Sequence, residues 1–327
     1  MKRGHVILLL ALVSAYAGCG ADRPGVSGEP PIAATDPPSV VVLGTAQDGG
    51  FPHAACRCDR CRMALGDPGR VRHVASLAIA LPKSERVFLV DATPDIRPQL
   101  QRIRELAAGP RHGIDRAPVD GVLLTHAHLG HYTGLAFFGF EAVHTRDLPV
   151  HCSPSMAGFL RSNQPWRQLI EIGNVRLHET VSGEPIDLGD GVRVVPLGVP
   201  HRDELSDTLA FIVRGPSSSL LYVPDTEGWE AWETPIEIVA AGVDIALLDG
   251  SFFSLDELPG RDLSAIGHPL IRDSMDRLAL LVENGSLRVY FTHLNHSNPA
   301  LDPEGPQRAE IERRGFAVLE DGQVLPL

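Results

Sequence analysis

Thr125-His126-Ala127-His128-Leu129-Gly130-His131 places three histidines within six residues. The apolar run before it, residues 118–124, predicts a buried strand, and residues 132–138 indicate that a helix begins after it. A loop at the end of a rigid strand can hold a metal ion, because the strand fixes the directions of its side chains. His126 and His128 can bind one ion through neutral imidazole nitrogens. A histidine-rich surface turn is the alternative, but three histidines so close together favour a metal site.

Four other apolar runs also end at a potential metal ligand, namely His201, Asp225, Asp249 and His293. Strands of a layered scaffold can bring their ends to one edge, where side chains from distant parts of the chain meet. We therefore predict that these residues and the histidine loop lie together. Mixed strand and helix runs follow residue 39 without a break and predict a single α/β domain over residues 40–327.

The expected elements are strands at 40–45, 74–81 and 87–90, a helix from about 95 to 108, a helix at 153–161, and a strand-rich region at 175–223. Ser153 is expected to cap the second helix, with Pro154 at its first position. Residues 46–50, Ala-Gln-Asp-Gly-Gly, predict a turn, and the close approach of a ligand to the two glycines is the alternative.

His-x-His-x-x-His after an apolar strand resembles the metallo-β-lactamase superfamily, whose usual motif is His-x-His-x-Asp-His. The wider context, HAHLGHYTGL with GTAQDGGFPHAACRC upstream, is similar to the PqqB branch, named for biosynthesis of pyrroloquinoline quinone (PQQ). Further matches occur in order between about residue 40 and residue 300: VDATPDIRPQL, VPHRDELSDTLAF, LLYVPDTEGW, LLDGSFF and FTHLNHSNP. The resemblance implies an αββα sandwich, in which two mixed sheets lie face to face with helices outside.

The resemblance also implies a ligand set for two metal positions. The first position would use His126, His128, His201 and a bridging Asp225, and the second would use His131, His293 and the same Asp225. Gly130 stands where the motif has aspartate, so the second position lacks one carboxylate and two tightly held zinc ions are less expected. His296, three residues after His293, is a candidate substitute, although the branch typically has asparagine there. The family counterpart of Asp91 orients loops near the metal.

Two enzymatic hypotheses follow. Two histidines and one carboxylate form the ligand set of non-haem iron oxygenases, so the first is a mononuclear iron oxygenase acting on a tyrosine-like or small amino-acid-derived substrate. The second is a zinc hydrolase that lowers the pKa of a bound water and polarises an ester, lactone, amide or phosphodiester. A non-catalytic metal-binding or ligand-binding lipoprotein is a third hypothesis, from another functional class.

Asp225 would hold the metal in either enzyme and is a catalytic candidate together with His268, which lies in Ile266-Gly-His-Pro269. His268 is expected either to touch substrate or to orient a ligand; a purely structural histidine is the alternative. The charged residues after His201 are expected to form a solvated loop or to support the ligands: Arg202, Asp203, Glu204 and Asp207.

Cys56, Cys58 and Cys61 form Cys-x-Cys-x-x-Cys, which suits three thiolates on one structural zinc. A local disulfide with a spare thiol is the alternative in an oxidising compartment. Related branches close such a site with a distant histidine, and the candidates are His53, His73 and His296. Cys152 is expected to be a small core residue at a strand end.

The first 18 residues carry two early basic residues and an apolar run from 6 to 17, as in a signal peptide, and Cys19 follows as at a lipoprotein cleavage site. Ordinary secretory cleavage is the alternative. Residues 19–39 are proline-rich and predict a linker. We therefore expect export to the periplasm or anchoring through Cys19, with the membrane contacted only by that lipid. The net charge of −12 disfavours nucleic acid as a partner and leaves a small-molecule substrate.

Overall fold

The structure, a computed structural model, describes residues 36–106, 114–257 and 267–327. These residues belong to one compact unit, Pro31–Leu327. The predicted signal peptide, 1–18, and the linker up to residue 35 lie outside the described residues, and so does Cys19. In the described part of the chain, every helix is too short or too polar to cross a membrane.

The first sheet has the strand order β14-β1-β2-β3-β4-β5-β6. Its strands are β1 (Ser39–Gly44), β2 (Ser76–Leu81), β3 (Arg86–Val90), β4 (Gly121–Leu123), β5 (Leu148–Cys152), β6 (Val175–Glu179) and β14 (Val324–Pro326). The sheet is mixed, because β14, β1, β2 and β3 pair antiparallel and β3 to β6 pair parallel.

The second sheet has the order β13-β12-β11-β10-β9-β8-β7. Its strands are β7 (Ile186–Gly189), β8 (Val192–Val199), β9 (Thr208–Arg214), β10 (Ser219–Val223), β11 (Ile245–Asp249), β12 (Arg288–Thr292) and β13 (Ala317–Val318). This sheet is mixed as well, with antiparallel pairing from β7 to β10 and parallel pairing from β10 to β13.

The two sheets bury one apolar layer between them. Ile79 and Phe88 from the first sheet share this layer with Phe211 and Tyr222 from the second. Neighbouring residues on the same strands point the other way, as the period of two in a strand requires, and pack under helices. Central strands are therefore buried on both faces, which explains why their sequences are continuous apolar runs.

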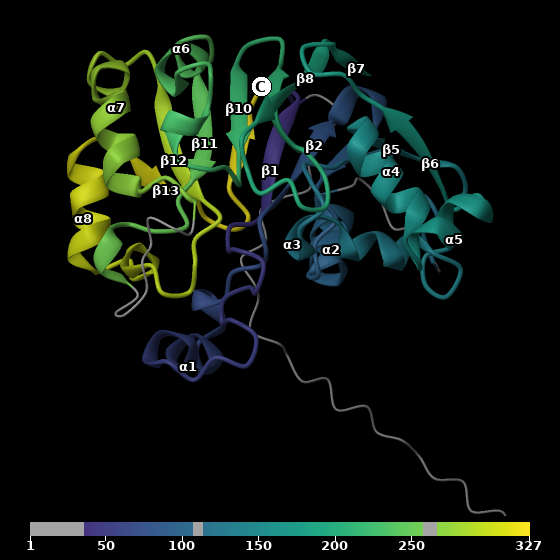
Figure 1. The fold of residues 1–327 in the computed structure, drawn as a ribbon, viewed down its shortest axis with the longest axis horizontal. Coiled ribbons are helices and arrows are strands. Elements are labelled where there is room, and N and C mark those ends of the chain that lie inside the picture. The colour runs from purple at the N-terminus through teal and green to yellow at the C-terminus, as the bar shows by residue number, and fades with distance from the viewer. Residues whose placement is uncertain (1–35, 107–113, 258–266) are drawn as a thin grey trace, which may run out of the picture. The chain divides into compact units, whose positions relative to one another are not determined.

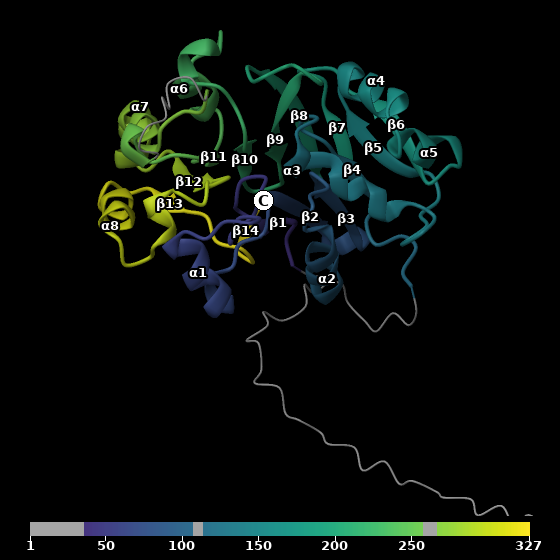
Figure 2. The same cartoon turned by 60° about the horizontal axis from the view of Figure 1, so that its bottom comes forward.

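Helices cover the outer face of each sheet (Figures 1 and 2). On the first sheet they are α2 (Ile96–Leu106), α3 (Leu129–Tyr132), α4 (Pro154–Ser162) and α5 (Trp166–Glu171). On the second they are α6 (Ile236–Ala240), α7 (Ile271–Glu283) and α8 (Pro306–Arg313), whereas α1 (Asp59–Gly66) lies below the strands in Figure 1. Short 3-10 helices lie at Pro68–Arg70, Pro82–Ser84, Thr133–Phe138, Trp229–Ala231, Leu255–Glu257 and Pro299–Leu301.

The predicted αββα sandwich of two mixed sheets is confirmed. The predicted cap of α4 is confirmed too, because the Ser153 hydroxyl accepts a hydrogen bond from the Met156 amide and Pro154 begins the helix. Strand β4 ends just before the histidine loop, and β8, β10, β11 and β12 end at or just before the other predicted ligands. The backbone amide of Leu209, on the second sheet, donates to the Thr125 carbonyl at 3.0 Å and so joins the histidine loop to that sheet.

Candidate metal centre

One cluster of ligands gathers around Asp225, which follows β10. The ligand atoms of His126, His128, His201 and Asp225 all lie within 4.8 Å of one another, and all four residues are buried. Asp225 Oδ2 lies 3.3 Å from His126 Nε2 and 3.2 Å from His201 Nε2. His128 approaches the same oxygen with its other ring nitrogen, Nδ1, at 3.9 Å. These are the residues predicted for the first metal position, and the fold brings them together.

The outer nitrogens of His126 and His128 have hydrogen-bond partners that fix the ring orientation. His126 Nδ1 lies 3.0 Å from the Thr125 hydroxyl. His128 Nε2 lies 3.2 Å from the carboxylate of Glu204, whose side chain is 51% exposed. A partner on the outer nitrogen fixes the tautomer and directs the inner nitrogen toward a metal. Of the charged residues after His201, Glu204 therefore supports a ligand, and Asp207 instead accepts a hydrogen bond from the Ser153 hydroxyl.

A second cluster shares the edge and consists of Asp48, His131 and His293. Asp48 Oδ1 lies 3.5 Å from His131 Nε2 and 3.9 Å from His293 Nε2. Asp225 Oδ2 lies 3.8 Å and 3.9 Å from the same two nitrogens, so Asp225 stands between the two clusters. His131 and His293 were predicted here, but Asp48 was not.

The outer nitrogens of the second cluster are also held. Asp91 Oδ2 lies 2.7 Å from His131 Nδ1 and also accepts from the Thr125 hydroxyl, which confirms its predicted orienting role. The Ser251 hydroxyl lies 3.1 Å from His293 Nδ1. Asp91 and His293 both have left-handed backbones, with φ of 63° and 58°. Non-glycine residues adopt this conformation only where the surrounding structure holds them, as it often does at functional sites.

Asp48 occupies the space beside Gly130. A Cβ atom added to Gly130 would lie 2.1 Å from Asp48 Oδ1 and 2.9 Å from Asp48 Cα. The prediction that the second position lacks a carboxylate is therefore wrong, because a residue from the turn after β1 supplies one. Residues 46–50 do form a turn, with the Gly50 amide donating to the Gln47 carbonyl, and the same turn presents Asp48. The signal in the sequence was a carboxylate in the turn that follows a strand, just before two glycines.

The chemistry of these donors fits bound metal ions. His126 Nε2, His131 Nε2, His293 Nε2 and Asp48 Oδ1 are buried and have no hydrogen-bond partner within the described residues. Buried polar atoms without a partner are rare, because each loses its hydration without compensation. Here they converge on two points beside Asp225, and a cation at each point would satisfy them. Imidazole with carboxylate is a donor set for zinc and for iron.

Burial and the local charges favour the metal-binding forms of His126, Asp225 and Asp48. Burial, with the charge of His131, holds the pKa of His126 well below its usual range, so its imidazole is neutral. Burial alone would raise the pKa of Asp225, but the charge of His293 and the close approach of the His126, His128 and His201 rings hold it well below its usual range. Burial opposes ionisation of Asp48 too, yet the nearby rings of His293 and His131 lower its pKa.

His268 also lies at this edge. Its ring centroid is 5.9 Å from that of His201 and 6.0 Å from that of His293. His268 Nδ1 lies 2.8 Å from Asp249 Oδ2 and 3.5 Å from Asp225 Oδ1. Burial lowers the pKa of His268, but the charge and hydrogen bond of Asp249, with the charge of Asp225, raise it to about 9. A histidine that carries a proton at neutral pH beside the clusters can donate it, so its predicted catalytic role fits this geometry.

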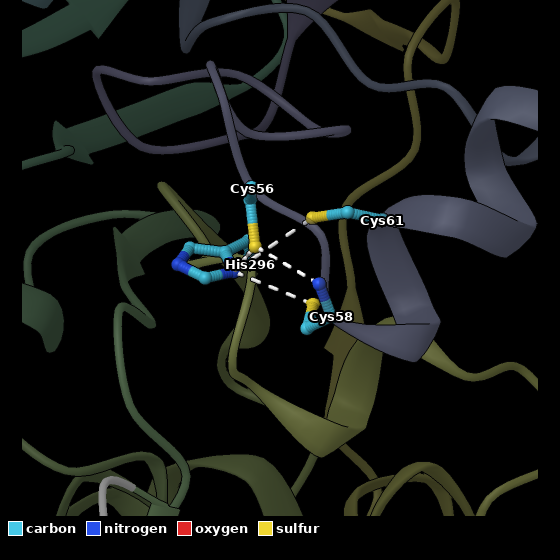
Figure 3. A group of neighbouring side chains, drawn as sticks. All are labelled: Cys56, Cys58, Cys61 and His296. Atoms are coloured by element: carbon cyan, nitrogen blue, oxygen red, sulfur yellow. Dashed lines mark hydrogen bonds between the residues drawn. The ribbon is translucent and has the colours of Figure 1, made fainter.

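The three cysteines form a separate group with His296 (Figure 3). His296 Nδ1 lies 3.5 Å from Cys56 Sγ and 3.8 Å from both Cys58 Sγ and Cys61 Sγ. The prediction that His296 compensates for Gly130 is wrong, because its side chain faces the sulfur atoms. Of the other candidates, His73 instead pairs with Asp321.

All four cysteines of the described chain are free thiols, so the local disulfide does not form there. Burial raises the pKa of the Cys61 thiol to about 12, and only a bound cation would keep it as a thiolate at neutral pH. Three thiols and one imidazole at these separations match a tetrahedral Cys₃His zinc site. Cys152 is fully buried at the end of β5, as expected.

Comparison with known proteins agrees with this architecture. The family model described as the beta-lactamase superfamily domain matches residues 86–294, a span that contains the histidine loop and His293. Coenzyme PQQ synthesis protein B of Methylobacterium nodulans is 30% identical over 306 residues, covering 88% of this chain and 99% of the relative. The protein of the same name from Methylorubrum extorquens is 28% identical over the same shares.

Solved structures show the same similarity. Zn²⁺-bound PqqB from Methylobacterium extorquens is 26% identical with a TM-score of 0.75. The match covers 88% of this chain and 100% of that one. A diphosphatase from the PhnP family has a TM-score of 0.61 at 22% identity, covering 89% of this chain and 98% of that one, and shares the fold.

Proposed function

Because this chain belongs to the β-lactamase superfamily and, within it, to the PqqB family of metalloenzymes, we propose that its metal centre is that of a hydrolase with two metal ions. The observation that carries this proposal is the position of Asp225 between two complete ligand clusters, with His126, His128 and His201 on one side and Asp48, His131 and His293 on the other. The substrate would be a small ester, lactone, amide or phosphodiester.

Bound metal ions at such a pair of positions lower the pKa of a water molecule and polarise the bond that it attacks. The chain contributes two carboxylates, Asp225 and Asp48, whose negative charges offset part of the charge of the cations. His268 is the candidate proton donor. Asp249 holds its Nδ1, and its Nε2 lies 3.4 Å from the side-chain nitrogen of Gln47.

The oxygenase hypothesis depended on an open metal position beside Gly130. Asp48 lies there, so that reason no longer holds. Zinc is the metal that we propose, since the similar PqqB structure is Zn²⁺-bound. A role in PQQ synthesis, the activity that the relatives' name carries, would make the substrate a precursor of that coenzyme.

Metal analysis together with activity measurements tests the proposed function. Protein purified without added metal should contain about three zinc ions per chain, two at Asp225 and one at the cysteines. It should hydrolyse at least one reporter from a panel of small esters, lactones, amides and phosphodiesters. A chelator should abolish that hydrolysis, and added zinc should restore it. One iron per chain, oxygen uptake and no hydrolysis would instead support the oxygenase.

We also propose that the chain is exported and anchored through Cys19, as residues 1–19 suggest. Expressed in a bacterial host, it should fractionate with membranes, because a lipid anchor contributes about 0.8 kcal/mol for each buried methylene. A Cys19→Ser variant should appear as soluble periplasmic protein. Intact Met1 on a protein found in the cytoplasm would contradict export.

A further inference from the structure

We infer that Asp48 is the carboxylate ligand of the second metal position and that it replaces, from a different loop, the aspartate that the superfamily motif carries at position 130. This inference rests on the proposed function, since it assigns a residue to the same centre. Asp48 Oδ1 faces His131 Nε2 at 3.5 Å and His293 Nε2 at 3.9 Å. It is buried and has no hydrogen-bond donor within the part of the chain that the structure describes.

Gly130 and Asp48 are complementary in shape. The Cβ of any larger residue at 130 would lie 2.1 Å from Asp48 Oδ1, far below the closest approach that real Cβ atoms show. A second contact, 2.9 Å to Asp48 Cα, involves the backbone and cannot be relieved by rotating the Asp48 side chain. An aspartate at 130 and Asp48 in its present place therefore exclude each other. The absence of an aspartate at position 130 and the presence of Asp48 in this place are therefore coupled.

The loop that carries Asp48 is held against the segment that carries His293. The Gln47 amide donates to the Leu294 carbonyl at 3.0 Å, and the Leu294 amide donates to the Thr45 carbonyl at 2.9 Å. The side-chain NH2 group of Asn295 donates to the side-chain carbonyl oxygen of Gln47. These bonds fix the backbone just before Asp48 relative to the segment of His293, as a relocated ligand requires.

The cysteine group adds a second link between the same two segments. Cys56 lies on the segment after Asp48, and His296 lies on the segment after His293. Cys56 Sγ and His296 Nδ1 are 3.5 Å apart. A zinc ion bound by these residues would connect the Asp48 loop to the His293 segment outside the catalytic edge. The motif aspartate of the superfamily lies in the same loop as its histidine neighbours, whereas Asp48 depends on this tertiary connection.

Removing the carboxylate at position 48 tests the inference. Asp48→Ala should reduce the zinc content from about three to about two ions per chain and weaken binding at the second position more than about 100-fold, since even outer-shell changes cost 10–100-fold. Gly130→Asp alone should not gain metal, because its side chain would collide with Asp48. Zinc content is measured by elemental analysis, and circular dichroism checks the fold.

Asp59→Ala is the matched control, because Asp59 lies on the same segment with a side chain that is 84% exposed. It should keep all the zinc. Unchanged zinc content in folded Asp48→Ala would overturn the inference. A different result would refute the proposed function, namely a natural protein that holds its zinc and hydrolyses none of the reporters. In that case the zinc content of Asp48→Ala would still decide whether Asp48 is a ligand.

Discussion

Asp225→Ala is expected to remove both catalytic metal ions and to lower hydrolysis by about 10³-fold or more, the equivalent of about 4 kcal/mol in the barrier. Asp225 Oδ2 lies between 3.2 and 3.9 Å from ring nitrogens of five histidines: His126, His128, His131, His201 and His293. No other described carboxylate is this close to both clusters. Its removal therefore takes one ligand and one negative charge from each metal position at once.

The loss should also appear without an activity assay. Elemental analysis of Asp225→Ala should find about one zinc ion per chain, held by the cysteine group. Asp187→Ala is the control, because Asp187 lies on β7 and makes a local hydrogen bond to the Gly189 amide. A variant at 225 that kept about three zinc ions, or most of the hydrolysis, would show that Asp225 does not bridge two metals.

Cys58→Ser is expected to release the structural zinc and to lower the free energy of unfolding by several kcal/mol. Zinc binding at structural sites is coupled to folding with apparent energies of about 10–16 kcal/mol in small peptides, so even partial loss exceeds the usual effect of a surface substitution. Cys58 is exposed, so the change to serine removes no core packing. Thermal unfolding and zinc content measure the two effects.

The cysteine variant should weaken the second catalytic metal as well, since the cysteine group holds the Asp48 loop beside His293. Cys152→Ser is the matched control. The Cys152 thiol is buried but lies outside the two catalytic clusters and the cysteine group, so zinc content should not change. A Cys58→Ser protein with unchanged zinc content and unchanged thermal stability would argue against a zinc at this site.

Local sequence patterns predicted the strands and the histidine loop, and the resemblance to the superfamily supplied the αββα arrangement and the ligand set. Apolar runs predicted the strands, because strands buried on both faces need continuous apolar sequence. The spacing of His126, His128 and His131 predicted the histidine loop, because residues on one short loop stay close in any fold that contains it. Ligands at the ends of separate strands, such as Asp225, were predicted from the resemblance together with the chemistry that a metal requires.

Only the tertiary structure determines which distant residues complete each site. His296 was a candidate for both sites, and the packing of its segment turns it toward Cys56, a residue 240 positions away. Asp48 looked like part of a turn, and the packing of that turn against Gly130 brings its carboxylate beside His131 and His293. Both outcomes depend on contacts between segments far apart in sequence. Neither the spacing nor the residue types within one segment contain that information, because the relative positions of the segments are set by the packing of the two sheets.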